Sequence, residues 1–448
     1  MTKTVAFYTL GCKVNQYESR HLEEQFRAGG YTVVDPSEPA LVYVVNTCTV
    51  TRLADRKSRQ FMRRAKRQNP DSIVVMMGCY PQTNPDETAQ IPEADIILDN
   101  EEKKLAFHRV EAYVKQDVSQ RCSPGMSPAR KESPAASPPD TPTRALLKIQ
   151  DGCDRFCSYC VIPYARGPVR SRPMEEILRE AETLIRTGYR ELVLTGINTA
   201  LYGADLQESN HGVASVIDEL CRLPGDFRIR LGSLEPTVVD AAYVEKLLVY
   251  DKLCHHLHLS VQSGSDRILK EMNRHYTVAD YLRIVRVVRD ADPSYGLTAD
   301  IITGFPGETE KEFQESLNLI RRVGYLKVHG FPYSKRPHTS AGKKEGALSS
   351  SVKKERNRQL IKVADAVALT FLKSLQGQTL RVLPEEVVTD KAGRCCWKGH
   401  ADNFVTVYGE CSSAELPAEG FVEVTVGEPY SDGVKAGKEL QDDRMHIL

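Results

Sequence analysis

Residues 151–160 read Asp151-Gly152-Cys153-Asp154-Arg155-Phe156-Cys157-Ser158-Tyr159-Cys160 and follow the strand-like apolar stretch Ala145–Gln150. Three cysteines are thus spaced C-x3-C-x2-C on one short segment. Clustered thiolates of this kind are typical ligands of a soft centre that contains several irons. Three thiolates on a four-iron cluster leave one iron open, and an open iron can chelate a substrate. The alternative is a structural zinc knuckle that lacks its fourth ligand.

The region around this motif alternates strand-like and helical patterns. Expected strands lie at Ala145–Gln150, Leu192–Thr195, Arg228–Gly232, His256–Val261, Leu297–Thr303 and Lys327–Pro332, with helices such as Met174–Thr187 and Thr309–Arg322 between them. Six successive βα steps predict a parallel, partly closed (β/α)6 barrel over residues 144–375. The cysteine motif then directly follows the first barrel strand.

The two ends of the chain have different patterns. Residues 1–117 alternate strands at Thr4–Leu10, Leu41–Asn46, Ile73–Gly78 and Asp95–Leu98 with helices, which predicts an open parallel α/β sheet. Residues 118–143 are rich in Pro, Ser and Ala and are expected to form a flexible linker. Residues 376–448 contain short strands at Leu380–Leu383, Phe404–Tyr408 and Phe421–Val426, which predict a small antiparallel β-barrel. The fold class is therefore α/β with three domains.

Three further cysteines occupy equivalent places in the N-terminal domain. Cys12, Cys48 and Cys79 each come just after an expected strand. The carboxyl ends of parallel strands share one edge of a sheet, where ligands bind, so the three thiols are expected to converge on a second, auxiliary cluster. The alternative is that they fill the core, as we assume for Cys221 and Cys254. The other cysteines, Cys122, Cys395, Cys396 and Cys411, form no recognisable site.

Composition limits the environment and the partners. The 448 residues include 60 basic and 60 acidic ones, so a polyanion has to be bound by a local patch. No apolar run is long enough for a membrane span, and the N-terminus lacks the layout of a signal peptide, which predicts a cytoplasmic protein. In that reducing compartment the twelve cysteines are expected to be metal ligands or thiols and not disulfides. No extended apolar stripe stands out, so we expect a monomer.

Two basic clusters are candidates for phosphate contact. One is the expected helix from about Arg52 to Arg67, which includes Arg63 and Arg64; the other follows the cysteine motif and contains Arg166, Arg170 and Arg172. The alternative for both is a solvated surface. The C-terminal domain has more acids than bases, so RNA contact there would depend on local groups. His255, His256 and His258 alternate with apolar residues and are expected to pack in the barrel or line its rim.

The chain resembles the radical-SAM methylthiotransferases, enzymes that use S-adenosylmethionine (SAM). The matching segments lie along nearly the whole chain apart from the linker: Thr9–Asn15, Asn46–Cys48, Gly78–Cys79, Cys160–Gly167, Ser260–Gly264 and Gly304–Thr309. This resemblance implies an N-terminal three-cysteine domain, a radical-SAM barrel and a C-terminal TRAM domain. The opening Leu10-Gly11-Cys12-Lys13-Val14-Asn15 is most similar to the bacterial branch that acts on N6-threonylcarbamoyladenosine at position 37 of tRNA, in the anticodon loop.

The resemblance also implies how the chemistry is divided. Cys153, Cys157 and Cys160 would hold the 4Fe-4S cluster that cleaves SAM to a radical, and Cys12, Cys48 and Cys79 would hold a second 4Fe-4S cluster that carries the sulfur. One SAM would donate the methyl group, and a second would supply the radical that removes the hydrogen from C2 of the adenine. An external one-electron donor and a sulfur source are required as partners.

Candidate SAM-binding residues lie at the carboxyl ends of the barrel strands, where barrel enzymes place their sites. They are Tyr159 in the cysteine loop and Thr195, Gly196, Glu235, Ser260, Gln262 and Gly304. Three alternatives to the leading function remain. The same chemistry would act on N6-isopentenyladenosine-37 in tRNA or on an aspartate of ribosomal protein S12, or the chain would be a non-catalytic RNA-binding protein with structural zinc.

Overall fold

A computed structural model describes residues 3–121, 143–206, 212–389, 393–411, 416–417 and 420–439. Of the predicted linker at 118–143, residues 122–142 lie outside the described residues, whereas residues 118–121 belong to a helix that begins at Ala106. The chain divides into two compact units. The first comprises the described parts of Met1–Ser137, Asp151–Pro168 and Ser334–Gly342; the second comprises those of Pro138–Gln150, Val169–Tyr333 and Lys343–Leu448.

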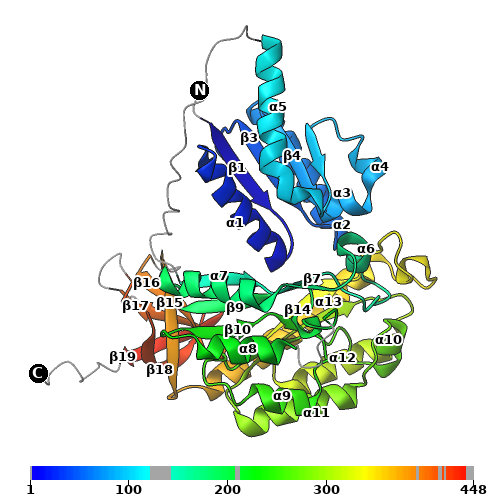
Figure 1. Ribbon diagram of the computed structural model, residues 1–448. Helices are drawn as coiled ribbons and strands as arrows, with labels where there is room; N and C mark the ends of the chain where they lie inside the picture. The colour runs from blue at the N-terminus through cyan, green and yellow to red at the C-terminus, as the bar shows by residue number, and fades with distance from the viewer. Residues whose placement is uncertain are drawn as a thin grey trace, which may run out of the picture. The chain divides into compact units, whose positions relative to one another are not determined.

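The first unit is built on a parallel five-stranded sheet of order β2-β1-β3-β4-β5 (Figure 1). Its strands are β1 (Thr4–Thr9), β2 (Thr32–Val34), β3 (Val42–Thr47), β4 (Ile73–Gly78) and β5 (Ile96–Leu98). Its helices are α1 (Lys13–Ala28), α2 (Arg52–Gln68), α3 (Cys79–Thr83), α4 (Pro85–Thr88), η1 (Glu102–Leu105), α5 (Ala106–Arg121) and, in the cysteine loop, α6 (Ile162–Arg166). Four of these strands were predicted, and only the short edge strand β2 was missed.

Apolar residues on both faces of this sheet explain why helices cover it on both sides. On β3, Val42 and Val44 pack with Phe26 of α1, whereas Tyr43 packs with Phe61 of α2. A strand that alternates its side chains between two faces is apolar throughout only when both faces are buried. The result is a three-layer α/β/α arrangement, and its parallel sheet confirms the prediction of an open parallel α/β sheet.

The second unit contains two parallel sheets with strand orders β10-β9-β6 and β11-β12-β13-β14. The strands are β6 (Arg144–Lys148), β9 (Glu191–Thr195), β10 (Arg228–Leu231), β11 (Ser233–Leu234), β12 (His256–Leu259), β13 (Gly296–Thr303) and β14 (Lys327–Pro332), with the two-residue strands β7 (Gln150–Asp151) and β8 (Arg170–Ser171). A parallel bridge between Ile229 of β10 and Leu253 connects the two sheets. No pairing between β14 and β6 occurs within the described ranges. Six main strands therefore form an open barrel, which confirms the predicted fold class.

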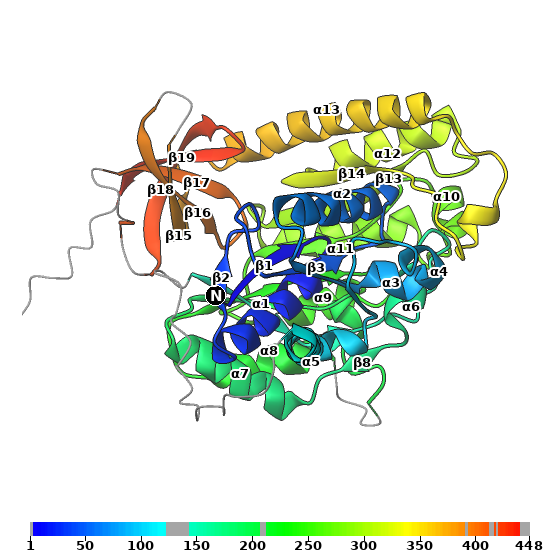
Figure 2. The same cartoon turned by 90° about the horizontal axis from the view of Figure 1, so that it is seen from above.

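Helices cover the outside of this barrel. They are α7 (Met174–Arg186), η2 (Thr199–Leu201), α8 (Val213–Arg222), α9 (Ala241–Leu247), α10 (Asp266–Glu271), α11 (Val278–Ala291), α12 (Glu310–Val323) and α13 (Ser350–Ser374). The short helix η3 (Ala341–Lys343) belongs for the most part to the first unit. The long helix α13 packs along β14 (Figure 2), where a Cβ at Gly330 would lie 3.0 Å from Leu360 Cδ2. Among the helices that the structure describes, none has both the length and the apolar character needed to cross a membrane.

The C-terminal strands close into a barrel of order β15-β16-β17-β19-β18 around the fully buried Trp397. They are β15 (Thr379–Thr389), β16 (Cys395–Ala401), β17 (Thr406–Glu410), β18 (Val422–Tyr430) and β19 (Gly433–Glu439). The prediction of a wholly antiparallel barrel is wrong in one detail, because β17 and β19 pair in parallel. Strands β16 and β19 were also missed.

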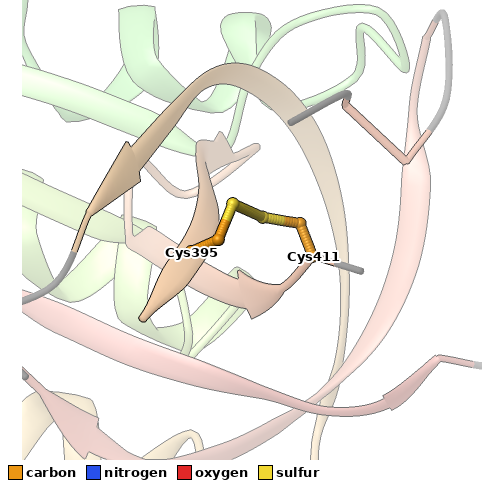
Figure 3. The surroundings of a disulfide bond; sticks show 2 residues. All are labelled: Cys395 and Cys411. Carbon is orange, nitrogen blue, oxygen red and sulfur yellow. A yellow bond between two sulfur atoms is a disulfide. The ribbon is translucent and has the colours of Figure 1, made fainter. Parts of the chain in front are cut away.

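A disulfide joins Cys395 at the start of β16 to Cys411 just after β17 (Figure 3). The two strands pair in antiparallel register, with Cys396 opposite Glu410, so both sulfur atoms lie at the same end of the hairpin. This corrects the expectation that the cysteines are all thiols or metal ligands. The nine remaining described cysteines form no disulfide in the structure.

Residues 400–404 of the C-terminal barrel cover the amino ends of the parallel strands. Arg228 Nη2 donates to the carbonyl of His400 at 2.9 Å, and Arg230 Nη2 donates to that of Ala401 at 3.1 Å. Both arginines also bond to Glu191 at 2.6–2.8 Å, and all three side chains are almost completely buried. Each charge of Glu191, Arg228 and Arg230 is thus paired with another group of the protein. We call this the sealed end of the barrel.

Candidate active site

Cys12, Cys48 and Cys79 lie at one edge of the N-terminal sheet. They follow β1, β3 and β4, which are neighbours in the sheet, with Asn46 of β3 paired with both Thr9 and Met77. The charge of each thiolate would affect the others, because Cys12 and Cys79 both act to raise the pKa of Cys48. The structure therefore brings together the three thiols that the strand pattern predicted to converge.

Two glycines make this close approach possible. Gly11 has φ of +101°, and a Cβ there would lie 2.9 Å from Cys48 Sγ. Gly78 has φ of +103°, and a Cβ there would lie 2.8 Å from Asn46 Oδ1. Any other residue would clash and would also be strained in this left-handed region. Steric exclusion thus explains why glycine precedes both Cys12 and Cys79.

The environment of these thiols suits a bound cationic group. Burial is the main reason why the pKa of Cys48 rises to about 12, and desolvation also raises that of Cys12 although Cys12 reaches the surface. Cys48 Sγ accepts from the backbone N–H of Val50 at 3.5 Å, and Cys79 Sγ accepts from Asn100 Nδ2 at 3.6 Å. N–H donors to sulfur and a nearby metal both stabilise thiolates that burial alone would keep protonated.

The C-x3-C-x2-C segment forms a compact loop in the same unit. The N–H of Cys153 donates to the carbonyl of Gly167 at 3.1 Å, and that of Cys160 donates to the carbonyl of Cys157 at 2.9 Å. Gly152 has φ of +71°, and a Cβ there would lie 1.7 Å from the carbonyl oxygen of Pro168. This glycine is therefore required for the loop to close on itself.

Arg166 connects this loop to the N-terminal domain. Its guanidinium bonds to Asp151 at 2.9 Å and to Glu18 of α1 at 3.2 Å, and it also donates to Asn15 Oδ1. The residue is only 3% exposed. We therefore correct the prediction that Arg166 contacts RNA, because the side chain is buried and paired with carboxylates of the protein. Its positive charge lowers the pKa of Cys12 and so opposes the effect of burial on that thiol.

A second buried arginine fixes the segment Ser334–Gly342. Arg336 Nη1 bonds to Asp55 of α2 at 2.7 Å, and the guanidinium also donates to the carbonyl of Thr49. The same segment contacts the cysteine loop, where the N–H of Ala341 donates to the carbonyl of Ser158 at 2.7 Å. No local sequence pattern predicts this arrangement, because each contact joins residues far apart in the chain.

The described residues contain no group of three or more His, Cys, Asp and Glu side chains arranged to hold a metal ion. A single ion needs donors that converge to within about 2.0–2.3 Å of one point. A four-iron cluster is larger than one ion, and its three ligands stand correspondingly farther apart.

The candidate SAM-binding residues of the second unit lie at the carboxyl ends of its strands. Thr195 ends β9 and Glu235 follows β11, where Arg274 at 2.9 Å and Asn198 Nδ2 at 2.9 Å hold the Glu235 carboxylate. A Cβ at Gly196 would lie 2.8 Å from Gln150 Oε1. Tyr159 lies in the cysteine loop of the first unit.

Three more candidates lie on the other sheet. Gln262 has φ of +69°, and its backbone bridges to β13 through Asp300 and Ile302 at 2.8 and 2.9 Å. Such strain in a residue other than glycine is common at functional sites. Ser260 Oγ donates to Asp300 Oδ2 at 3.2 Å. Gly304 has φ of +71° and packs against Lys353 of α13.

The other predicted RNA-contacting arginines differ in their exposure. Arg63 and Arg64 are exposed on α2, although Arg63 Nε lies 3.3 Å from Glu93. Arg170 is exposed, whereas Arg172 bonds to Glu180 at 2.7 Å and is only partly accessible. Arg63, Arg64 and Arg170 are therefore accessible to solvent, which phosphate contact would require.

Comparison with known proteins agrees with this arrangement. The family model described as "Radical SAM superfamily" matches residues 147–320, and that described as "Uncharacterized protein family UPF0004" matches residues 4–99. The first match implies one 4Fe-4S cluster and SAM as cofactors. The two matches cover the two groups of three cysteines separately.

Two relatives are similar over most of the chain. "Threonylcarbamoyladenosine tRNA methylthiotransferase MtaB" from Bacillus subtilis (strain 168) is 39% identical, with 96% of this chain and 96% of the relative covered. "tRNA-2-methylthio-N(6)-dimethylallyladenosine synthase" from Geobacillus thermodenitrificans (strain NG80-2) is 34% identical, with 84% of this chain and 73% of the relative covered.

A solved structure has a similar fold. The radical S-adenosylmethionine methyltransferase TsrM from Kitasatospora setae, with tryptophan substrate and a SAM analog bound, matches with a TM-score of 0.55 and 16% identity. The match covers 76% of this chain and 75% of that chain. At this identity the similarity concerns the fold alone.

Proposed function

The chain belongs to the MtaB family of threonylcarbamoyladenosine tRNA methylthiotransferases, and we propose on this basis that it replaces the C2 hydrogen of N6-threonylcarbamoyladenosine with a methylthio group. The proposed substrate is this nucleoside at position 37, in the anticodon loop of tRNA. The proposal also includes an external one-electron donor and a sulfur source as partners.

The observation that carries the proposal is the presence of two separate groups of three cysteines. A radical-SAM enzyme of ordinary type needs only Cys153, Cys157 and Cys160. The additional convergence of Cys12, Cys48 and Cys79, supported by Gly11 and Gly78, favours a second cluster in the same protein. Three ligands in each group leave room for a non-protein ligand at each site.

The chain's own residues position and shield these sites. When bound, the two clusters and SAM supply the electron transfer, the radical and the methylthio group. Asn100 and the backbone of Val50 donate to the auxiliary thiols, and Arg166 places a buried positive charge beside them. We propose that the residues that contact SAM are Tyr159, Thr195, Gly196, Glu235, Ser260, Gln262 and Gly304. The residues proposed to contribute to tRNA binding are Arg63, Arg64, Arg170 and Arg172.

Anaerobic iron and sulfide analysis with Mössbauer spectroscopy tests the two-cluster proposal. The wild type is expected to contain two 4Fe-4S clusters, and the triple variant Cys153/Cys157/Cys160→Ala is expected to keep one. The matched variant Cys12/Cys48/Cys79→Ala should keep the other, while Cys221→Ala serves as the control. A wild type with one cluster, and no iron in the first variant, would contradict the second site. Zinc without sulfide would instead favour the non-catalytic RNA-binding alternative.

Nucleoside analysis of tRNA from a deletion strain tests the substrate. Loss of the methylthio form of threonylcarbamoyladenosine, with accumulation of the form without sulfur, is the expected result. Loss of the methylthio form of isopentenyladenosine would favour the branch that includes the Geobacillus relative. Unchanged tRNA with altered ribosomal protein S12 would exclude both tRNA substrates.

A further inference from the structure

The inner face of the parallel barrel carries polar residues on three neighbouring strands. On β12 and β13 the odd-numbered residues belong to the apolar core that lies between the strands and the surrounding helices. Because side chains alternate along a strand, the even-numbered residues point to the inside of the barrel. On β14 the core residue is Val328, and Gly330 faces α13. The odd-numbered residues of β14 therefore point to the inside, together with the even-numbered residues of β12 and β13.

Four of these residues, His258, Ser260, Asp300 and His329, form what we call the inner polar cluster. Asp300 Oδ2 lies 3.2 Å from His258 Nε2 and 3.2 Å from Ser260 Oγ. His258 Nδ1 is 2.9 Å from Thr298 Oγ1, which fixes the ring. His329 is paired in register with Asp300, and its ring centroid is 6.1 Å from that of His258.

The inner polar cluster is only partly enclosed. The side chain of Asp300 is 28% exposed, that of His258 is 15% exposed, and His329 is exposed. Within the described ranges, His329 makes no hydrogen bond. Burial acts to raise the pKa of Asp300, but the hydrogen bonds with His258 and Ser260 and the charges of His258 and His329 together outweigh it, so this pKa lies below its ordinary value. An ionised carboxylate and an imidazole with unused hydrogen-bonding capacity thus face the same space.

Strand β14 adds an aromatic ring on one side of the cluster and a cation on the other. Lys327, His329 and Phe331 all point inward and are exposed, with Phe331 45% exposed at the carboxyl end. At about 3.3 Å per residue, His329 lies about 7 Å and Lys327 about 13 Å from Phe331 along the strand. An aromatic surface, a hydrogen-bonding cluster and an ammonium group therefore follow one another in a line.

This order matches a purine with a long polar substituent. The base would stack on Phe331, because aromatic side chains bind bases through their faces. N–H and hydroxyl groups would donate to Asp300, and a terminal carboxylate would pair with His329 and Lys327. A dimethylallyl substituent offers none of these groups and would cover the polar cluster without satisfying it, which is strongly unfavourable.

We propose that the inner polar cluster, together with Lys327, is the subsite that recognises the N6-threonylcarbamoyl group of the substrate. This assignment rests on the proposed function and adds the residues that separate the threonylcarbamoyl substrate from the isopentenyl one. In this assignment His329 and Lys327 read the carboxylate, and Asp300 reads the N–H and hydroxyl donors, with His258 and Ser260 as positioning residues.

The test uses the reconstituted holoenzyme and two anticodon stem-loop RNAs. One carries threonylcarbamoyladenosine and the other carries its methyl ester, which lacks the carboxylate charge. The wild type is expected to have a kcat/KM roughly tenfold to hundredfold higher for the free acid, as for a hydrogen bond to a charged group. In His329→Gln this ratio should fall towards one, mainly through a higher KM for the free acid. Asp300→Asn should raise KM for both RNAs.

His255→Gln is the matched control. His255 is an exposed histidine of the same unit that bonds to Asp292 at 2.8 Å, away from the inner face, so its variant should keep the wild-type ratio. Circular dichroism and iron content are measured for every variant. If Asp300→Asn does not fold, His329→Gln, at an exposed position, still decides the result.

Two negative results are distinguishable. If the wild type converts the free acid and both His329→Gln and Asp300→Asn keep its ratio and its KM, the subsite assignment is overturned and the proposed function stands. If the wild type converts neither RNA although both clusters are present, the proposed function fails, and the subsite assignment fails with it.

Discussion

The two ends of the barrel's inner face both carry charges but satisfy them differently. At the amino end Glu191 is completely buried and bonds to Arg144, Arg228 and Arg230 at 2.6–2.9 Å. Farther along the strands, Asp300 is bonded to His258 and Ser260 and remains partly exposed. A charge network that the protein completes by itself holds the fold together, whereas an incomplete one has capacity left for a ligand.

The largest expected effect concerns the sealed end. Glu191→Gln removes the charge that three arginines share, and we expect a loss of about 3–5 kcal/mol in unfolding free energy because buried cations are left uncompensated. Urea unfolding measures this loss. Glu219→Gln is the control, since its pair with Arg222 is exposed and should be worth less than about 1 kcal/mol. Similar small losses in both variants would break the comparison.

A smaller effect is expected at the contact between the two barrels of the second unit. Gly296 begins β13, and a Cβ there would lie 1.9 Å from the carbonyl oxygen of Asn403. Gly296→Ala should therefore cost about 1–3 kcal/mol through overpacking, measured as a lower melting temperature. In the control Gly212→Ala, the nearest atom is a Tyr243 hydroxyl 3.3 Å away, and a much smaller shift is expected. An unchanged melting temperature for Gly296→Ala would mean that the backbone around Asn403 can move to accommodate the added methyl group at little cost.

The open end should show the opposite profile. Asp300→Asn keeps the size of the side chain at a partly exposed position, so we expect its unfolding free energy to change by less than about 1 kcal/mol. Its effect should appear instead in KM for the RNA substrate. A variant that loses several kcal/mol while its KM is unchanged would place Asp300 with the architectural charges and remove the contrast between the ends.

The smallest effect concerns the exposed pair of His255 and Asp292. The hydrogen bond with His255 is the main reason why the pKa of Asp292 falls to about 2. A carboxyl group whose pKa is lowered in the folded state stabilises the fold at pH values above its ordinary pKa of about 4. This stabilisation is lost as the pH falls from about 4 towards 2. Because solvent screens the pair, we expect less than about 1 kcal/mol, measured as the part of the acid-induced loss that is absent in Asp292→Asn. A larger difference would show that a partly exposed pair contributes as much to the free energy of unfolding as the buried network around Glu191.

Hydrophobic periodicity was sufficient to predict most strands and the placement of the six cysteines. The predicted strand Lys327–Pro332 agrees with the structure at both ends. Cys12, Cys48 and Cys79 were placed by the strands before them, because parallel strands end at one edge of a sheet. The roles of the six cysteines and the predicted domain boundaries stay predictions, since nothing yet tests them directly.

Long-range polar contacts could not be predicted. A run of arginines looks the same in sequence whether the guanidinium groups meet phosphate or carboxylate. Arg166 pairs with Glu18, which is 148 residues away, and no local pattern marks that partner. The Cys395–Cys411 disulfide was missed for a related reason, because it depends on the pairing of β16 with β17, and β16 lacks the alternation that identifies a strand.

Strands β6 and β14 do not pair with each other in the part of the chain that the structure describes, and this has a topological consequence for a polymeric substrate. A nucleotide within RNA is tethered on both sides by phosphodiester bonds, so it cannot thread through a closed ring the way a free metabolite can diffuse into one. A barrel that stops at six strands has no such ring to pass. A flipped base is therefore expected to enter sideways, with its two flanking nucleotides left outside and without any strand separating during each turnover.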